Sequence, residues 1–364
     1  MKILLIEAYY GGSHKLWADQ LKGFSKHDIE ILSLPARHWK WRMEGAAIEL
    51  ANQLKSYHDK PDLILATSML DLNFLKSNLP KGWGSIPCIY YMHENQLTYP
   101  TSSNDEDKKQ GRDYHYGMIQ FKSMLSADQV CFNSNFHKQE FFAALKKLLS
   151  RLPDYSPLEQ MNQLSVESMV LNVGVRDPKL PMQKNTVPVV LWNHRWEYDK
   201  NPELFFRSLI NIKEELDFKL IVLGSKARTY PKIFNEAQKE LSSNIFHWGY
   251  VETEEEYLQL INQSDILPVT SNQDFFGISI IESILTGATP LLPNRLVYPE
   301  HFDTKQHKNL FYESEAEFHN KLKELIRNPI QETQKNSLIN KAKEYLWSRQ
   351  ITYYDQLFES LKIE

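Results

Sequence analysis

The chain has very little cysteine. Its 364 residues include only two, Cys88 and Cys131, and each lies in an apolar run typical of a strand. Thiols in such runs are expected in the core rather than in a disulfide or a metal site, and their scarcity favours a cytoplasmic setting. No group of cysteines and histidines has the spacing of a structural zinc site. The sequence therefore supports neither a disulfide framework nor a zinc-stabilised domain.

Long hydrophobic runs and an excess of one charge are missing as well. No apolar stretch approaches the roughly 20 residues that a membrane-spanning helix needs. The segment from Met1 to Glu7 reaches an acidic residue too early for a signal peptide, so we expect it to be a buried strand. The formal net charge is -4, which argues against non-specific binding to nucleic acid, because such binding depends on many phosphate contacts. A local basic face is compatible with this balance.

What the chain has is the composition of a globular protein, with 42% hydrophobic and 24% charged residues. Its length favours two domains of roughly 150 to 200 residues. Short apolar runs alternate with amphipathic segments, which predicts parallel α/β sheets. The expected strands cover residues 3–6, 29–32, 63–66, 88–92, 129–132, 189–192, 219–223, 245–248, 265–269 and 289–292. The predicted fold is thus α/β, with two doubly wound Rossmann-like domains facing each other across a cleft.

Prolines mark the expected boundary between the two domains. Three of them lie in the stretch 178–188, which has no helical period and is typical of a linker. We expect the first domain to cover residues 1–177 and the second to cover residues 178–348. Residues 349–364 are expected to form a C-terminal helix that can return to the first domain.

The segment that begins at Asp274 carries the most informative pattern. After the acid come two phenylalanines and Gly277, where a helix is expected to begin. The free N–H groups at the start of that helix suit a bound phosphate or sugar hydroxyls. Glu282 lies eight positions after Asp274 among isoleucines. Because burying an unpaired carboxylate is costly, we expect Glu282 to have a partner.

Polar residues also follow two predicted strands of the first half. Gly11 and Gly12 come directly after the first strand, so the backbone there can approach a ligand, although a tight strand-to-helix connection explains them equally well. No G-x-G-x-x-G is present, so the dinucleotide fingerprint is not met. His93 opens a polar run after the fourth strand, at the edge where doubly wound sheets bind ligands. A structural histidine remains the alternative.

Two basic residues follow the first strand of the second half. Arg195 and Lys200 lie five positions apart across a turn before a helix, so both can contact one diphosphate. The alternative is two solvated charges in a loop. Gly224 and Gly249 follow the next two strands, where they suit either nucleotide contact or plain turn chemistry.

The oddest segment of the first half mixes cations with indole rings. Arg37, Trp39, Lys40, Trp41 and Arg42 occur within six positions. Cations for phosphates and planes for stacked bases are the pair of features that RNA recognition uses. A loop packed by its own tryptophans is the alternative. A second segment adds polar and aromatic groups in the sequence Arg112, Asp113, Tyr114 and His115.

Asp274 and Glu282, with seven residues between them and Phe276-Gly277 inside, resemble the E-x7-E signature of retaining GT-B glycosyltransferases of the glycogen-synthase and sucrose-synthase type. Aspartate stands where most relatives have glutamate. Further motifs are similar to those of the tRNA-queuosine mannosyltransferase family, and the similarity is weakest over 150–168 and after 300. These motifs cover residues 6–15, 34–42, 93–100, 112–117, 132–134 and 195–202.

The resemblance implies a retaining, metal-independent hexosyltransferase. It implies transfer of mannose from GDP-mannose to the cyclopentenediol of queuosine in tRNA-Asp. In such an enzyme Arg195 and Lys200 hold the diphosphate, Asp274 binds sugar hydroxyls, Glu282 binds the ribose and His93 orients the sugar. Other residues implied on the donor side are Gly11, Gly12, Gly224, Gly249, Gly277 and Ile278. Those implied on the acceptor and RNA side are Ser13, His14, Arg37, Trp39, Lys40, Trp41, Arg42, Glu94, Asn95, Gln96, Arg112, Tyr114 and His115.

Two other functions remain open at this level. A glycosyltransferase of the same fold can act on a lipid or polysaccharide at a membrane, and the basic amphipathic stretch 138–147 suits that reaction. An RNA-binding protein on a disused glycosyltransferase scaffold is the non-enzymatic alternative, which the intact acidic and basic motif residues disfavour. The acidic triplet at 105–107 lies in a polar stretch and is expected to be solvated charge rather than a metal site.

Overall fold

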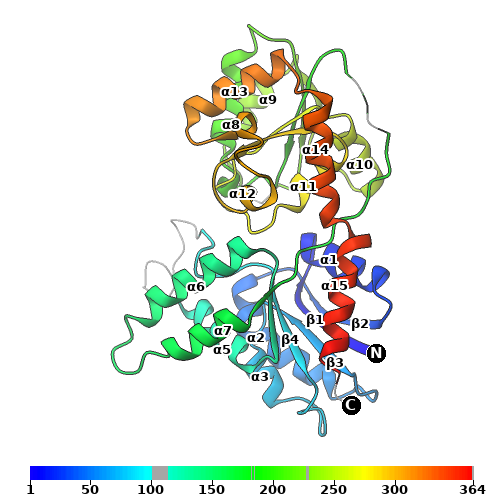
Figure 1. Ribbon diagram of the computed structural model, residues 1–364, viewed down its shortest axis with the longest axis vertical. Helices are drawn as coiled ribbons and strands as arrows, with labels where there is room; N and C mark the ends of the chain where they lie inside the picture. The colour runs from blue at the N-terminus through cyan, green and yellow to red at the C-terminus, as the bar shows by residue number, and fades with distance from the viewer. Residues whose placement is uncertain (101–113, 182, 184, 227–228, 363–364) are drawn as a thin grey trace. The chain divides into compact units, whose positions relative to one another are not determined.

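The computed structural model describes residues 1–100, 114–181, 183, 185–226 and 229–362. The chain divides into two compact units, one formed by Met1–Gly174 with Trp347–Glu364 and the other by Val175–Leu346. Each unit contains a six-stranded parallel sheet with helices around it (Figure 1). The α/β fold predicted from the alternating pattern is confirmed. The acidic triplet at 105–107 and Arg112 lie outside the described residues.

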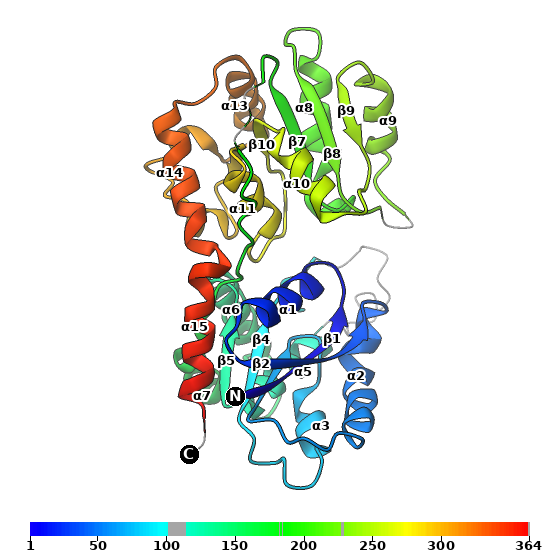
Figure 2. The same cartoon turned by 90° about the vertical axis from the view of Figure 1, so that its right-hand side faces the viewer.

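The first unit has the strand order β2-β1-β3-β4-β5-β6. Because β1 lies between β2 and β3, the direction of winding reverses beside β1, and this reversal is where doubly wound sheets bind ligands. Helices α1 and α15 lie on one face, with α2, α3 and α5 on the other (Figures 1 and 2). The elements are β1 (Lys2–Tyr10), α1 (Gly12–Phe24), β2 (Asp28–Pro35), α2 (Trp39–Leu54), β3 (Leu63–Thr67), α3 (Leu72–Ser77), β4 (Cys88–Met92), α5 (His115–Ser126), β5 (Gln129–Phe132), α6 (Asn135–Leu149), α7 (Leu158–Glu167), β6 (Met169–Val170) and α15 (Trp347–Ser360).

The second unit has the strand order β12-β11-β10-β7-β8-β9, so its winding reverses between β7 and β10. Helices α8 and α9 cover one face, and α10 and α11 cover the other (Figure 2). The elements are β7 (Val189–Asn193), η1 (Tyr198–Lys200), α8 (Pro202–Ile212), β8 (Lys219–Leu223), α9 (Ile233–Glu240), β9 (Ile245–Trp248), α10 (Glu254–Asn262), β10 (Ile266–Pro268), α11 (Ile278–Leu285), β11 (Thr289–Pro293), α12 (Tyr298–His301), η2 (Lys308–Leu310), β12 (Phe311–Tyr312), α13 (Glu315–Arg327), α14 (Glu332–Ala342) and η3 (Lys343–Tyr345).

Several strands of the two sheets are buried along their whole length. Every residue of β3, β4, β7 and β11 is buried. Helices on both faces of a parallel sheet exclude water from both sides, which is why these strands are continuous apolar runs without alternation. Because these strands are buried, the polar residues that follow their carboxyl ends are the ones that can contact a ligand.

The C-terminal helix α15 packs within the first unit. The indole nitrogen of Trp17 in α1 donates a hydrogen bond of 3.1 Å to the hydroxyl of Tyr354. The indole nitrogen of Trp347 donates to the side-chain oxygen of Gln20 at 2.6 Å. A Cβ atom at Gly174 would lie 2.1 Å from the Trp347 ring, so only glycine fits beneath that indole. Residues at the two ends of the chain thus form one core.

Every helix within the described residues is too short or too polar to cross a lipid bilayer.

Candidate functional site

In the second unit, Lys200 is held between two acidic side chains at the carboxyl end of β7. Its ammonium nitrogen donates to the backbone oxygen of Gln273 at 2.6 Å and to Oδ1 of Asp274 at 3.1 Å. Oδ2 of Asp199 lies 3.4 Å from the same nitrogen. Lys200 and Asp274 were both predicted site residues, and the structure brings them into contact. Asp199 was not predicted, although it directly precedes Lys200.

Asp274 is fixed by a second hydrogen bond, from the other side. The hydroxyl of Tyr298 in α12 donates to Oδ2 of Asp274 at 2.6 Å. Burial acts to raise the pKa of Asp274, but the Lys200 ammonium and the Tyr298 hydrogen bond outweigh it and hold the pKa below its ordinary value. The carboxylate is therefore ionised and held from two sides. Nothing in the sequence around Tyr298 signals this role.

The buried His194 lies close enough to Lys200, Arg195 and Asp274 for their charges to affect its pKa. Burial, reinforced by the charges of Lys200 and Arg195 and opposed by Asp274, lowers the pKa of His194 to about 4. Its Nε2 atom is buried and has no hydrogen-bond partner among the described residues. The guanidinium of Arg195 is half exposed and pairs with Glu197 at 3.1 Å. Among the charged groups that act on His194, Arg195 is therefore the most exposed.

The partly buried Glu282 in α11 has a hydrogen-bond partner, as the sequence predicted, and the partner is a phenol. The hydroxyl of Tyr257 in α10 lies 2.7 Å from Oε2 of Glu282. Asn193 in turn donates to the Tyr257 oxygen at 2.9 Å. Burial raises the pKa of Glu282 to about 7, against the lowering effect of the Tyr257 hydrogen bond. Tyr257 was missed because it lies 25 positions before Glu282 in another helix.

This raised pKa predicts a pH-dependent stability. Between about pH 4.5 and about pH 7, the folded protein keeps a proton on Glu282 that the unfolded chain has lost. Stability contributed by this group is therefore lost as the pH rises through that window. We expect Glu282→Gln to be more stable than the wild type at about pH 8 and to lose this advantage at about pH 5. Urea unfolding at the two pH values measures the difference.

The exposed Glu255→Gln, in the first turn of α10, is the matched control and should shift stability equally at both pH values. A Glu282→Gln variant with the same advantage at about pH 5 and about pH 8 would contradict the assignment.

Four of the predicted glycines, Gly12, Gly224, Gly249 and Gly277, have positive φ angles that favour glycine. Gly224 has φ of +108°, and a Cβ atom there would lie 2.0 Å from the backbone oxygen of His194. Gly277, with φ of +80°, precedes Ile278 at the start of α11. Gly249 follows β9 and donates its backbone N–H to Val222 at 2.8 Å. The backbone of the loops after β7 and β8 can thus pass close to one another.

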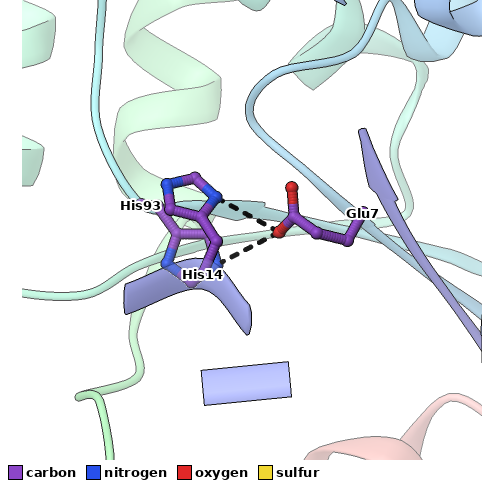
Figure 3. Close-up of side chains that lie close together, drawn as sticks. All are labelled: Glu7, His14 and His93. Carbon is purple, nitrogen blue, oxygen red and sulfur yellow. Dashed lines mark hydrogen bonds and ion pairs between the residues drawn. The ribbon is translucent and has the colours of Figure 1, made fainter. Parts of the chain in front are cut away.

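In the first unit, two acidic and two histidine side chains meet at the carboxyl ends of β1 and β4. Nδ1 of His14 lies 3.2 Å from Oε2 of Glu7, and its Nε2 lies 3.0 Å from Oε2 of Glu94. Nε2 of His93 lies 3.8 Å from the same Glu7 oxygen (Figure 3). His14 and His93 were predicted site residues on separate motifs, and the structure brings their rings to 4.3 Å. Glu7 was not assigned a role.

The two histidines of this cluster differ in charge. Burial opposes protonation of His14, but Glu94 and Glu7 raise its pKa well above the ordinary value. Burial, with the charge of His14, lowers the pKa of His93 well below the ordinary value. The rings of Trp17 and Tyr91 pack against His93 at 4.5 and 4.8 Å, which accounts for its burial. One histidine is therefore charged and the other neutral.

Glu7, His14 and His93 are also spaced for a metal ion, since one ligand atom of each lies within 4.8 Å of the others. A reaction without a metal stays a prediction.

Other predicted residues near this cluster have structural contacts. Asn95 is buried, and its side-chain oxygen accepts hydrogen bonds from the backbone N–H groups of Leu97 at 3.1 Å and Thr98 at 2.9 Å. The backbone N–H of Gln96 donates to Gln120 at 3.0 Å. Gly11 lies against Ala36, since a Cβ atom at Gly11 would lie 2.4 Å from that residue's Cβ. Gly12 and Ser13 are exposed at the start of α1.

The basic and aromatic segment at residues 37–42 enters helix α2 at Trp39, so its side chains point in different directions. Trp41 is 60% exposed, and Arg37 is exposed as well. Lys40 lies over the ring of Trp39 at 5.6 Å. Arg42 is buried, and its guanidinium donates to the backbone oxygen of Pro35 at 3.2 Å. Successive helical residues point about 100° apart, so Trp41 faces outward and Arg42 faces the core.

Two residues of the second predicted segment and its continuation, His115 and Tyr116, contact helix α2. Tyr114 is exposed, and the His115 ring hydrogen-bonds to Glu44 of α2. Tyr116 packs against Trp39 with ring centroids 5.1 Å apart. The two predicted aromatic and basic segments are therefore neighbours in space.

Comparisons with known proteins match both units. Residues 2–175 match the family model described as tRNA-queuosine alpha-mannosyltransferase N-terminal, and residues 178–345 match glycosyl transferases group 1. The chain is 34% identical over 328 residues to the tRNA-queuosine alpha-mannosyltransferase of Drosophila melanogaster, covering 86% of this chain and 84% of that protein.

Solved glycosyltransferase structures share the fold. Sucrose-phosphate synthase from Thermosynechococcus elongatus superposes with a TM-score of 0.72 at 15% identity, covering 99% of both chains. A glycosyltransferase from Rickettsia africae superposes with a TM-score of 0.65 at 16% identity, covering 99% of this chain and 98% of that one. At such identities the likeness extends to the fold alone, and that fold is GT-B.

Proposed function

Because the chain belongs to the tRNA-queuosine alpha-mannosyltransferase family, we propose that it transfers a mannosyl group to queuosine in tRNA. The observation that carries the proposal is the 34% identity to a curated relative, which extends over 86% of this chain. That coverage takes in parts of both units rather than the widespread group 1 domain alone. The finer proposal is that GDP-mannose is the donor and the cyclopentenediol of queuosine in cytoplasmic tRNA-Asp is the acceptor.

The donor side of the proposal is supported by the charged residues Arg195, Lys200 and Asp274 of the second unit. A diphosphate leaving group gains negative charge as the glycosidic bond breaks, and preplaced cations lower the energy of that state. Lys200 and Arg195 are the cations at the point where the winding of the second sheet reverses, and α11 begins nearby at Ile278. We propose that they stabilise the diphosphate without a metal, while Asp274 binds sugar hydroxyls and Glu282 binds the ribose.

We further propose that the transfer retains the configuration at the anomeric carbon. In this scheme the departing phosphate takes the proton of the attacking hydroxyl, so that the protein supplies position and charge rather than a nucleophile. His93, neutral at its low pKa, is proposed to orient the sugar. On the acceptor side, the exposed Arg37 and Trp41 suit a phosphate and a stacked base.

Mass spectrometry of modified tRNA tests the function. The purified protein is incubated with GDP-mannose, or with UDP-glucose as donor control, and with tRNA that contains or lacks queuosine. We expect one added hexose on queuosine, only with GDP-mannose and only in the queuosine-containing tRNA. Hexose transfer to tRNA that lacks queuosine, or no transfer to either tRNA, would refute the proposed acceptor.

A further inference from the structure

The contacts of His14 are set by two carboxylates. Its Nδ1 lies 3.2 Å from Glu7 and its Nε2 lies 3.0 Å from Glu94. An ionised carboxylate only accepts hydrogen bonds, and a neutral imidazole has one donor and one acceptor nitrogen. Both contacts can be hydrogen bonds to ionised carboxylates only if both ring nitrogens donate. With both carboxylates ionised, the geometry calls for an imidazolium ion between Glu7 and Glu94.

The two carboxylates that flank His14 differ in burial. The Glu7 side chain is fully buried, and its Oε1 accepts a 2.8 Å hydrogen bond from the backbone N–H of Tyr9. The Glu94 side chain keeps 18% exposure. Its Oε2 is used by His14, and its Oε1 has no hydrogen-bond partner among the described residues. In this series of three hydrogen-bonded side chains, Glu7 is therefore fixed by the surrounding protein. Glu94 has an oxygen left to accept a hydrogen bond from a ligand.

We propose that Glu7 and His14 are a positioning couple that holds Glu94 aimed at a hydroxyl of the acceptor's diol, an inference that rests on the proposed function. Glu7 supplies the buried charge that keeps His14 an imidazolium. His14 then fixes one Glu94 oxygen and leaves the other to accept a hydrogen bond. A fixed carboxylate repels phosphate, so its partner is an uncharged hydroxylated group and not the RNA backbone. Glu94 thus selects for the modified base.

A bound metal ion is the competing use of Glu7, His14 and His93. A metal bound to either ring nitrogen of His14 would displace that nitrogen's proton and its hydrogen bond to Glu7 or Glu94. The couple and the metal site are therefore mutually exclusive, and the experiment below separates them.

The first measurement uses the wild-type protein with no acceptor. Nitrogen-15 histidine labelling with proton NMR at neutral pH is expected to show both ring N–H protons of His14, with the Nδ1–H signal lost in Glu7→Gln. A single His14 ring proton in the wild type would overturn the couple. Zinc or another transition metal bound in stoichiometric amount in the purified protein, and lost in His93→Gln, would overturn it equally.

The second measurement is kinetic. In Glu94→Gln and Glu7→Gln, we expect kcat/KM for queuosine-containing tRNA to fall roughly 10- to 100-fold, the loss that accompanies a charged hydrogen bond. The dissociation constant of GDP-mannose should stay within about twofold, since Glu94 is assigned to the acceptor. Asp355→Asn is the matched control, because Asp355 is a buried acid of the same unit that accepts from Ser25 at 2.6 Å and lies 4.0 Å from His27. It should keep wild-type kinetics.

The outcomes separate this inference from the proposed function. No transfer to queuosine-containing tRNA by the wild type would refute the function, whatever the NMR spectrum shows. Normal transfer by the wild type together with unchanged acceptor kinetics in both glutamine variants would refute the positioning couple alone. Loss of donor affinity in step with acceptor kinetics would also refute it, because it would show a general structural role.

Discussion

Replacing Lys200 with alanine is expected to lower the turnover number by about 10²-fold or more, which is the loss that follows removal of one preplaced group from a developing charge. The structure makes this the largest expected effect on catalysis. The ammonium is fixed by Gln273 at 2.6 Å and Asp274 at 3.1 Å, so it needs no reorganisation when a diphosphate departs. Steady-state kinetics with GDP-mannose and queuosine-containing tRNA measure the loss.

The Lys200→Ala variant must be measured per folded molecule. Removing the ammonium leaves the carboxylates of Asp199 and Asp274 without their cation, which costs about 3 kcal/mol or more. Turnover is therefore normalised to the folded fraction from circular dichroism. Lys213→Ala is the control, since Lys213 pairs with Glu240 at the surface of the same unit at 2.8 Å. Unchanged turnover and donor affinity in Lys200→Ala would defeat the assignment.

Changing Asp274 to asparagine is expected to lower turnover by about 10²-fold as well, for a different reason. The carboxylate accepts from Lys200 through one oxygen and from Tyr298 through the other. An asparagine has one oxygen, so its amide nitrogen must face either an ammonium or a hydroxyl. The group that is proposed to bind sugar hydroxyls then loses its charge and its fixed orientation. Kinetics with GDP-mannose and the same tRNA measure the loss.

Tyr298→Phe provides the graded comparison for Asp274. It removes one of the two hydrogen bonds and keeps the charge, so we expect a loss of about 10-fold. Asp303→Asn is the control, because this acid caps a turn of the same unit by accepting from the backbone of Lys305 at 2.7 Å. A Tyr298→Phe variant as impaired as Asp274→Asn would show that the phenol, and not the carboxylate charge, is what the reaction needs.

The sequence alone was enough for the fold, because its signals are local. Continuous apolar runs at residues 88–92 and 189–192 predict buried parallel strands, and the strands found there, Cys88–Met92 and Val189–Asn193, each consist of five buried residues. The helix expected from Gly277 is also present, as Ile278–Leu285. A strand or helix depends on the periodicity of its own residues, which one sequence contains in full.

The sequence predicted residues of the site only where those residues belong to a motif. The motif spacing singled out Lys200 and Asp274, and the structure places them in contact. Their other partners, Asp199 and Tyr298, were not predicted, and neither was the phenol of Tyr257 beside Glu282. Arg42 looked like a neighbour of Trp41 on an RNA-binding face, but the helical turn buries it. No local pattern states which side chain will fill the space beside a carboxylate.

By itself, then, the sequence determined two parallel sheets and the polar groups that follow their strands. Only the tertiary structure decided which of those groups touch and which of them carry charge. His14 is charged because Glu7 and Glu94 reach it from β1 and from the end of β4, and His93 is neutral because Trp17 and Tyr91 enclose it. Charge in a buried group depends on what surrounds it in space, and residues that lie 80 positions apart supply those surroundings.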